Sequence, residues 1–206
     1  MKILFLADVE AKAYWDFFHK EDFEDIDLIV SCGDLQASYL SFLATMVPVP
    51  VLYVRGNHDD RYNTDPPGGC ICIEDDIYTF RGVRILGLGG CNRYKAGINQ
   101  YTDRQMKKRV KKMRYKIWKN GGFDILVTHS PAKGLHDDTD PCHIGFDTFN
   151  EMIEKYKPAY FVHGHVHMNY GRKFPREDMV GNTRVINAYQ KYIVEIPENE
   201  KERAVP

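Results

Sequence analysis

Side chains of the kinds that bind metal ions gather in five short segments of the chain. These segments are Asp8-Val9-Glu10, Gly33-Asp34, Gly56-Asn57-His58-Asp59, Thr128-His129-Ser130-Pro131 and His163-Gly164-His165-Val166-His167. Carboxylate and amide oxygens and imidazole nitrogens are common protein ligands of divalent cations. Two such cations held close together can hydrolyse an ester by activating water. The residue types therefore predict a two-metal hydrolytic site, provided that the fold brings the segments together.

The stretches before these segments predict how they meet. Short apolar runs typical of buried strands occupy residues 2–7, 27–32, 49–54, 124–127 and 159–162. Open α/β sheets place their binding sites at the carboxyl ends of strands. We therefore expect the five segments to lie at one edge of a sheet structure. The alternation in Gly164-His165-Val166-His167 would point both imidazoles to the same side of an extended segment.

The rest of the chain follows the pattern of an α/β protein. We expect helices over residues 13–20, 38–45, 103–119 and 145–156. Arg81-Gly82 separates two expected strands, 77–80 and 83–88, as a hairpin turn would, and residues 185–188 and 192–196 form a final strand pair. Neither a linker nor an internal repeat is visible. We expect one domain over residues 1–197 and a frayed charged tail over residues 198–206.

Composition narrows the range of partners. With 206 residues and 43% hydrophobic residues, the chain can bury one good core. A formal net charge of −1 gives no long-range reason to expect nucleic acid or a membrane as partner. The first residues lack a signal-peptide pattern and an apolar run long enough to span a membrane, so we expect a cytoplasmic protein. The five cysteines show no repeated metal spacing and suit a reducing compartment, so we expect them to be unpaired.

The basic stretch from Arg104 to Lys119 has two interpretations. Met106, Val110, Met113 and Ile117 recur at helical spacing, which makes the segment amphipathic with its basic residues on the outer face. The first interpretation is a solvated helix face. The second is a surface that steers an anionic substrate towards the site.

Taken in order, the five segments resemble the calcineurin-like metallophosphoesterase superfamily. Its pattern is D-x-H, G-D, G-N-H-D/E, a lone His and G-H-x-H, and residues 8–167 match it at every ligand position except Glu10. The stretches 124–131 and 164–171 are similar to the small phosphodiesterase branch that contains the mammalian brain metallophosphoesterase-domain proteins. The resemblance implies an αββα sandwich, in which helices flank two mixed β-sheets.

The resemblance also implies a ligand set for two divalent ions. The first ion would be held by Asp8 and His167, and Asp34 would bridge the two ions. The second ion would have three further ligands, Asn57, His129 and His165. A single aspartate can serve as the bridge because its two oxygens can span cations roughly 3.5–4 Å apart.

Glu10 stands where the family pattern has histidine. A carboxylate is a competent ligand and would favour hard ions, so we expect Glu10 to bind the first metal. The alternative is that its longer side chain leaves the first site loosely occupied. Manganese is the favoured metal, with iron, magnesium, zinc, cobalt or nickel as alternatives.

The implied reaction is hydrolysis of a small-molecule phosphodiester by a metal-bridging hydroxide. His58 would face the substrate and either stabilise the developing charge or protonate the leaving oxygen. Asn57 and Arg93 would lie beside the phosphate, although Arg93 could equally be a surface loop residue. Two alternatives remain. One is a binding scaffold with weak or no turnover, which the Glu10 mismatch suggests. The other is a phosphomonoesterase or protein phosphatase, although protein phosphatases carry a longer Gly-Asp-x-x-Asp-Arg-Gly motif.

Overall fold

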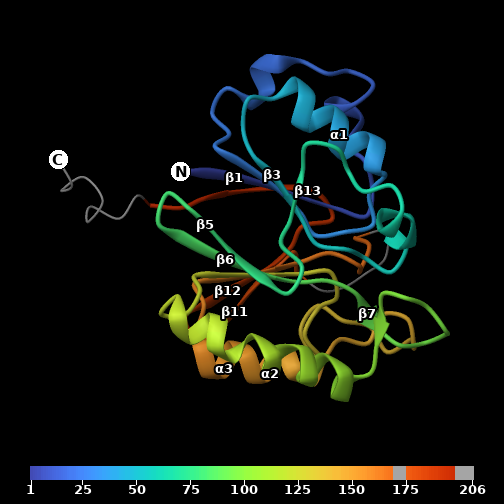
Figure 1. Ribbon diagram of the computed structural model, residues 1–206, viewed down its shortest axis with the longest axis vertical. Helices are drawn as coiled ribbons and strands as arrows, with labels where there is room; N and C mark the ends of the chain where they lie inside the picture. The colour runs from blue at the N-terminus through green and yellow to red at the C-terminus, as the bar shows by residue number, and fades with distance from the viewer. Residues whose placement is uncertain (169–174, 198–206) are drawn as a thin grey trace.

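Two mixed β-sheets lie face to face at the centre of the computed structural model (Figure 1). The structure describes residues 1–168 and 175–197. The first sheet has the order β13 (Gln190–Glu195), β1 (Lys2–Ala7), β2 (Leu28–Ser31), β3 (Val51–Tyr53), β4 (Ile71–Cys72). The second has the order β11 (Glu177–Val180), β12 (Thr183–Asn187), β10 (Tyr160–His163), β9 (Ile125–Thr128), β6 (Val83–Leu88), β5 (Asp76–Phe80). A small separate sheet pairs β7 (Cys91–Asn92) with β8 (Gln100–Tyr101).

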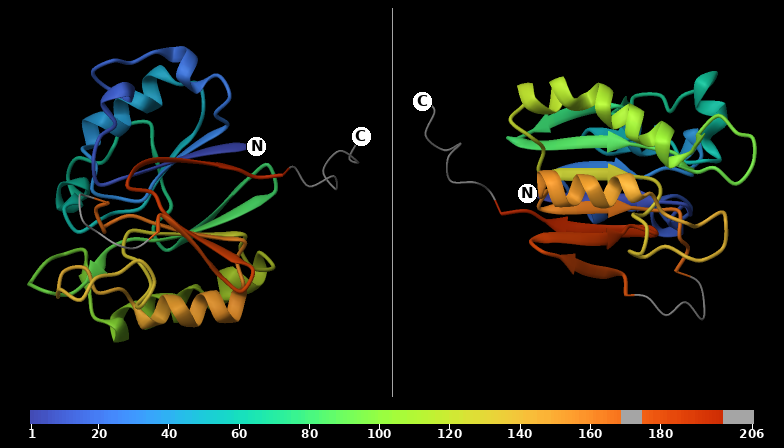
Figure 2. Two further views of the ribbon diagram at one scale, coloured as in Figure 1. Left: turned by 180° about the vertical axis from the view of Figure 1, so that it is seen from behind. Right: turned by 90° about the horizontal axis from the view of Figure 1, so that it is seen from below.

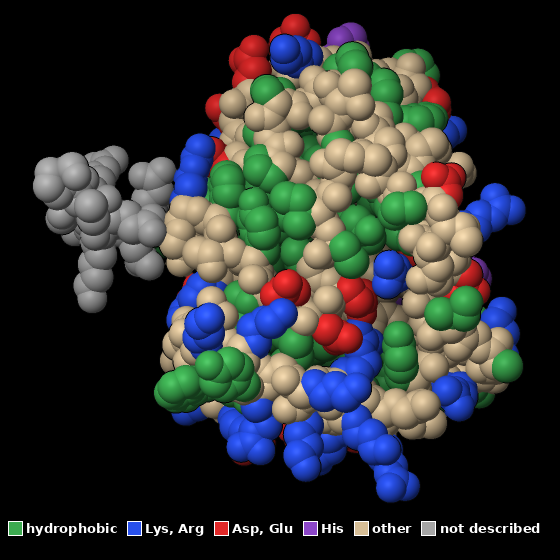
Figure 3. Space-filling view, viewed as in Figure 1, with side chains coloured by type: hydrophobic (Ala, Val, Ile, Leu, Met, Phe, Trp, Pro, Cys, Tyr) green, Lys and Arg blue, Asp and Glu red, His purple; other side chains and the backbone are tan. Residues whose placement is uncertain are grey.

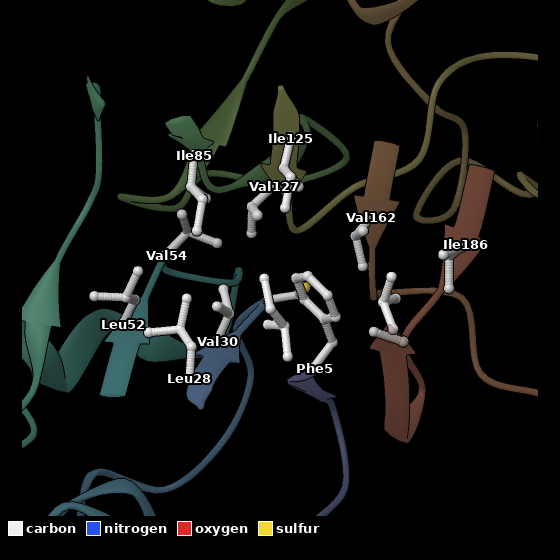
Figure 4. Packing of buried hydrophobic residues seen from close by; sticks show 14 of the residues in the cluster. Phe5, Leu28, Val30, Leu52, Val54, Ile85, Ile125, Val127, Val162 and Ile186 are labelled. Atoms are coloured by element: carbon white, nitrogen blue, oxygen red, sulfur yellow. The ribbon is translucent and has the colours of Figure 1, made fainter. Parts of the chain in front are cut away.

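Parallel pairing in both sheets brings strand ends to the same edge. Strands β1 to β4 run parallel, as do β12, β10, β9 and β6, and antiparallel strands border each set. Their apolar runs are unbroken because both faces of each sheet are covered. In β1, Phe5 faces the core between the sheets, where it lies near Val30 and Val127 (Figure 4). The neighbouring Leu4 and Leu6 face the other way, towards the layer outside the first sheet.

Helices cover the outer faces. Helix α1 (Ala37–Met46) packs on the first sheet through Tyr39, Leu40 and Leu43. Helices α2 (Asp103–Lys119) and α3 (Asp147–Tyr156) lie across the second sheet (Figure 2). The start of α2 is fixed by a capping box, in which the Thr102 hydroxyl and the Gln105 side chain each accept a hydrogen bond from the other residue's backbone N–H. The architecture confirms the αββα sandwich expected from the sequence.

One expected helix is wrong. Residues 13–20 do not form an α-helix, and two 3₁₀ turns, Lys12–Tyr14 and Lys20–Phe23, bracket an irregular stretch. Tyr14, Phe17 and Phe18 have the i, i+3, i+4 spacing of one helical face, but neither turn has a side-chain cap. Their rings pack individually instead, as Phe18 does against Phe23 and Phe42, with ring centroids 5.5 and 5.2 Å away. Tertiary packing of aromatic rings therefore outweighs local helical propensity in this stretch.

The expected final strand pair is also wrong. Residues 185–187 belong to β12 of the second sheet and residues 192–195 to β13 of the first, so the two segments do not pair with each other. Each pairs with a strand distant in the sequence instead, β12 with β10 and β13 with β1.

The expected hairpin turn and the unpaired cysteines are confirmed. Arg81 and Gly82 have φ values of 45° and 77°, as the two central residues of a tight β-hairpin turn require. All five cysteines are free. None of the helices within residues 1–168 and 175–197 is long and apolar enough to cross a membrane. The charged tail expected over 198–206 lies outside the described residues, as do 169–171 of the second family-like stretch.

Candidate metal centre

Three of the expected ligands meet where strands of both sheets end. Asp34 follows β2 of the first sheet, and His129 and His165 follow β9 and β10 of the second. Each offers one ligand atom, and these atoms all lie within 4.8 Å of one another. The His129 and His165 ring centroids are 4.7 Å apart. The segments that are distant in the sequence therefore converge, as their placement after strands predicted.

His129 is oriented as a metal-binding histidine usually is. Its side chain is fully buried, and Nδ1 lies 2.9 Å from the carbonyl oxygen of Cys32, to which it can donate a hydrogen bond. That bond leaves Nε2 to face two oxygens, Asn57 Oδ1 at 3.0 Å and Asp34 Oδ2 at 3.3 Å. A backbone carbonyl that fixes the far nitrogen is a common arrangement around bound metals. His129 Nε2, Asn57 Oδ1 and Asp34 Oδ2 can therefore all donate an electron pair to one cation bound among them.

The electrostatics of the site also favour a cation. Burial lowers the pKa of His129, but the carboxylates of Asp34, Asp8 and Asp59 together outweigh that effect and raise it to about 9. For Asp34, burial raises the pKa, but His129 and the backbone N–H of His58 outweigh it and lower the pKa to about 2. Burial raises the pKa of Asp8 to about 7, with His129 acting against the shift. Without a metal, protons must balance these carboxylates. A divalent ion would do so directly, and the donor set fits such an ion.

Three expected ligands have unusual backbone conformations. Asp8, Asp34 and His165 have φ values of 67°, 58° and 68°, in the left-handed region that residues other than glycine rarely adopt. Such conformations persist where the surrounding structure holds them, and they cluster at functional sites. Here the surroundings include the backbone N–H of His165, which donates to Asp8 Oδ1 at 2.9 Å and thereby links the two sheets.

Two glycines allow the ligand loops to approach closely. A Cβ on Gly56 would lie 2.1 Å from Asp34 Oδ1 and 2.7 Å from the Asp34 backbone nitrogen. A Cβ on Gly164 would lie 2.6 Å from Ala7 Cβ and 2.9 Å from Asp8 Oδ2. The Gly-Asn-His and Gly-His-x-His segments therefore need glycine for space beside the carboxylates.

Sequence reasoning gave no role to two residues that support the site. Asp59 is 4% exposed, and its Oδ2 accepts hydrogen bonds from the backbone N–H groups of Asp34 (2.8 Å) and Gly56 (2.7 Å). The family pattern, which ends in Asp or Glu at this position, was the available signal for Asp59. The carbonyl oxygen of Cys142 lies 2.6 Å from His165 Nε2, so it can fix that ring as Cys32 fixes His129. No sequence signal pointed to Cys142, because its backbone alone makes this contact.

Other expected site residues surround the cluster at different distances. The Asn57 amide nitrogen lies 3.5 Å from the Tyr94 hydroxyl. His58 donates its backbone N–H to Asp34 Oδ1 at 2.8 Å, while its side chain is exposed. His167 packs its ring on Tyr189 at 5.0 Å. Arg93 is exposed, and its guanidinium contacts the carbonyl oxygen of Gln100 at 3.4 Å.

Glu10 is the expected ligand that points elsewhere. Its Oε1 accepts the backbone N–H of Gln36 at 3.1 Å, at the start of α1, and it is outside the cluster of Asp34, His129 and His165. The two residues also line a recess of about 260 Å³, together with Trp15 and Lys12. Glu10 and Gln36 each lie two residues after an expected ligand, but none of Asp34, His129 and His165 lines the recess.

Comparison with known proteins places these features in a wider group. A family model described as calcineurin-like phosphoesterase matches residues 1–169. UPF0046 protein K07C11.7 of Caenorhabditis elegans is 23% identical over 92% of this chain and 70% of its own length. The crystal structure of TT1561 of Thermus thermophilus superposes with a TM-score of 0.62 at 14% identity, covering 92% of this chain and 89% of that one. Phosphopantetheinyl hydrolase (PptH) of Mycobacterium tuberculosis superposes with a TM-score of 0.57 at 16% identity, covering 100% and 93%. At these identities the two solved structures show a shared fold.

Proposed function

Because the chain belongs to the calcineurin-like phosphoesterase family, whose model matches residues 1–169, we propose that it is a two-metal phosphodiesterase of small molecules. One observation carries the proposal. The buried His129 presents Nε2 to Asn57 and Asp34, beside His165, at the strand ends of both sheets. We assign the chain to the small phosphodiesterase branch on the residue pattern of its segments.

We propose seven metal ligands, with Asp34 bridging the two ions. They are Asp8, Glu10, Asp34, Asn57, His129, His165 and His167. When bound, two divalent ions, preferably manganese, would supply a hydroxide nucleophile at neutral pH and offset the charge of the phosphoryl oxygens. Glu10 could take part through Oε2, because only its Oε1 accepts the N–H of Gln36.

The residues of the chain would bind and orient the phosphoester. His58 follows Asn57 directly and is exposed, so its imidazole is free to swing over the phosphate and protonate the leaving oxygen. The Arg93 guanidinium would bind a phosphoryl oxygen. The recess lined by Glu10, Trp15 and Gln36 offers room for the organic part of the substrate. Its volume of about 260 Å³ suits a small molecule rather than a protein or nucleic-acid chain.

The test uses metal-free protein reconstituted with manganese. Bis(p-nitrophenyl) phosphate and p-nitrophenyl phosphate are assayed side by side, with His129→Ala as the site variant and His19→Ala, an exposed residue outside the site, as its control. We expect faster hydrolysis of the diester, and a loss of at least about 100-fold in His129→Ala alone. Equal activity of wild type and His129→Ala would contradict the proposal. A preference for the monoester would support the phosphomonoesterase alternative.

A specific observation favours a second candidate, a binding scaffold with little turnover. The Glu10 carboxylate is engaged by Gln36 rather than by the ligand cluster. Fewer than two manganese ions per chain after reconstitution, together with no hydrolysis, would favour the scaffold.

A further inference from the structure

Helix α2 concentrates positive charge on one side of the molecule. Nine of its 17 residues are Lys or Arg and one is Asp, so the helix contributes +8 to a chain of net charge −1, and the rest of the chain carries −9. Three of the nine are paired: Lys107 with Glu151, Arg109 with Glu74 and Lys116 with Asp76. The other six make no ion pair with any residue in 1–168 or 175–197, namely Arg104, Lys108, Lys111, Lys112, Arg114 and Lys119.

Five residues of α2 form its outermost line, which we name the outer ridge. Arg104, Lys108, Lys111, Tyr115 and Trp118 follow one another at spacings of four, three, four and three residues, which places them on one helical face. The buried residues Met106, Met113 and Ile117 lie on the opposite face. The ridge is therefore the part of α2 most remote from the core.

The ridge ends in two aromatic side chains that are largely exposed. Tyr115 is 71% exposed and Trp118 is 74% exposed, and their ring centroids lie 5.9 Å apart. Lys and Arg side chains gather over this face of the molecule, with a group of hydrophobic side chains at one end (Figure 3). Tyr and Trp with exposed rings beside basic residues are the composition found where proteins meet the headgroup layer of a bilayer.

A basic groove runs beside the ridge. It has a volume of about 240 Å³ and lies between α2 and α3, where Lys107, Lys111, Arg114 and Lys155 contribute to its lining. Its one acidic residue, Glu151, is paired with Lys107, so three cations remain in excess. Basic recesses of this kind bind the phosphorylated headgroups of lipids. The groove shares Lys111 with the outer ridge, so one anionic surface could engage both.

We propose that the outer ridge of α2 is a docking surface for a membrane rich in anionic phospholipid. The apolar face of α2 stays packed on the protein core, so the outer ridge would be held at the bilayer surface by charge, with its Tyr and Trp rings at the level of the headgroups. Single-stranded nucleic acid, by contrast, is bound in basic channels whose aromatic rings are spaced to stack successive bases. Here the two rings lie against each other at one end of the ridge. The proposal does not depend on the phosphoesterase activity, because the ridge shares no residue with the candidate metal centre.

The experiment measures binding of the full chain to vesicles. The chain contains two tryptophans, so Trp15→Phe leaves Trp118 as the fluorescent reporter. Phosphatidylcholine vesicles with about 30% phosphatidylserine are compared with pure phosphatidylcholine vesicles, at low and high salt. We expect Trp118 emission to shift to the blue and the protein to sediment only with the anionic vesicles at low salt.

Charge variants test whether the basic residues of the outer ridge cause the binding to vesicles. Lys108→Gln/Lys111→Gln should bind the anionic vesicles roughly 30-fold more weakly, whereas the matched control Lys20→Gln/Lys191→Gln, which removes two exposed charges away from α2 and α3, should bind as wild type. Equal binding to both vesicle types would overturn the proposal, as would equal loss in both variants. Binding to a single-stranded RNA 20-mer without binding to vesicles would also overturn it and identify the ridge as a nucleic-acid surface.

Discussion

A single added methyl group at Gly56 should disable the centre although it replaces none of the proposed ligands. In Gly56→Ala the new Cβ would lie 2.1 Å from Asp34 Oδ1, 2.6 Å from its Cγ and 2.7 Å from its backbone nitrogen, whereas ordinary contact begins at 3.4 Å. The carboxylate must therefore move by about 1 Å or more. Rotating the Asp34 side chain cannot remove the whole clash, because the backbone nitrogen is also too close.

The size of the effect follows from what Asp34 would lose. Its Oδ1 accepts the N–H of His58 at 2.8 Å, a hydrogen bond to a charged group worth about 1.5–3 kcal/mol. The overpacking itself costs about 1–3 kcal/mol. A displacement of about 1 Å in a catalytic group can reduce the rate about 100-fold. We expect Gly56→Ala to fold with reduced stability and to lose about 100-fold in activity.

The chain offers a matched control in Gly68→Ala. Neither Gly56 nor Gly68 has a positive φ, and the one atom near the Cβ of Gly68→Ala is Ser41 Oγ at 3.6 Å, an ordinary contact. Hydrolysis of bis(p-nitrophenyl) phosphate and manganese binding by calorimetry are measured for both variants, with urea unfolding as the stability measurement. Activity of Gly56→Ala within about threefold of that of Gly68→Ala would refute the steric reasoning.

Three further predictions concern electrostatics. Burial and Asp34 raise the pKa of Asp59 from 3.8 to about 7, so its favourable contribution to stability is present below about pH 4 and lost as the pH rises through about 7. We therefore expect the free energy of unfolding of chelator-treated wild type to fall between pH 4 and pH 8 by up to ~4 kcal/mol more than that of Asp59→Asn, as measured by urea unfolding. An equal fall in both proteins would contradict this. If Glu10 binds the first metal, Glu10→Gln should weaken one manganese site about tenfold or more in calorimetry, and unchanged affinities would show that Glu10 serves only the start of α1. The Arg109 side chain is 11% exposed and pairs with Glu74, so Arg109→Ala should destabilise the fold by about 3–5 kcal/mol in urea unfolding, against less than about 0.5 kcal/mol for the exposed control Arg104→Ala.

Local patterns predicted the elements whose signals are themselves local. The expected strand 2–7 and helix 103–119 coincide with β1 and α2. An unbroken apolar run and a capped amphipathic stretch can both be recognised without knowledge of the tertiary structure. The two-residue strands β7 and β8 were missed because only their pairing with each other defines them. Strand β13 pairs with β1, which lies more than 180 residues earlier in the chain. No local sequence pattern predicts such a pairing.

The same limit applies to the site. The residue types and their order indicated His129 and Asp34 because metal ligands have restricted chemistry. The sequence could not show that the Glu10 side chain turns towards Gln36, because that depends on where α1 begins in space. Nor could it show that a backbone carbonyl, that of Cys142, holds the ring of His165. Contacts made by backbone atoms carry no residue-type signal.

The candidate ligands are divided between the two sheets, and this has a consequence for how the protein would unfold. Asp34 and Asn57 follow strands of the first sheet, whereas His129 and His165 follow strands of the second. A bound ion would therefore act as a cross-link between the layers at one end of the sandwich, while apolar packing and the Arg81–Asp27 ion pair hold the other end. Since a ligand that binds only the folded state stabilises it according to its concentration, the melting temperature should rise with added manganese. Thermal opening of the metal-loaded protein should then begin at the edge away from the metals.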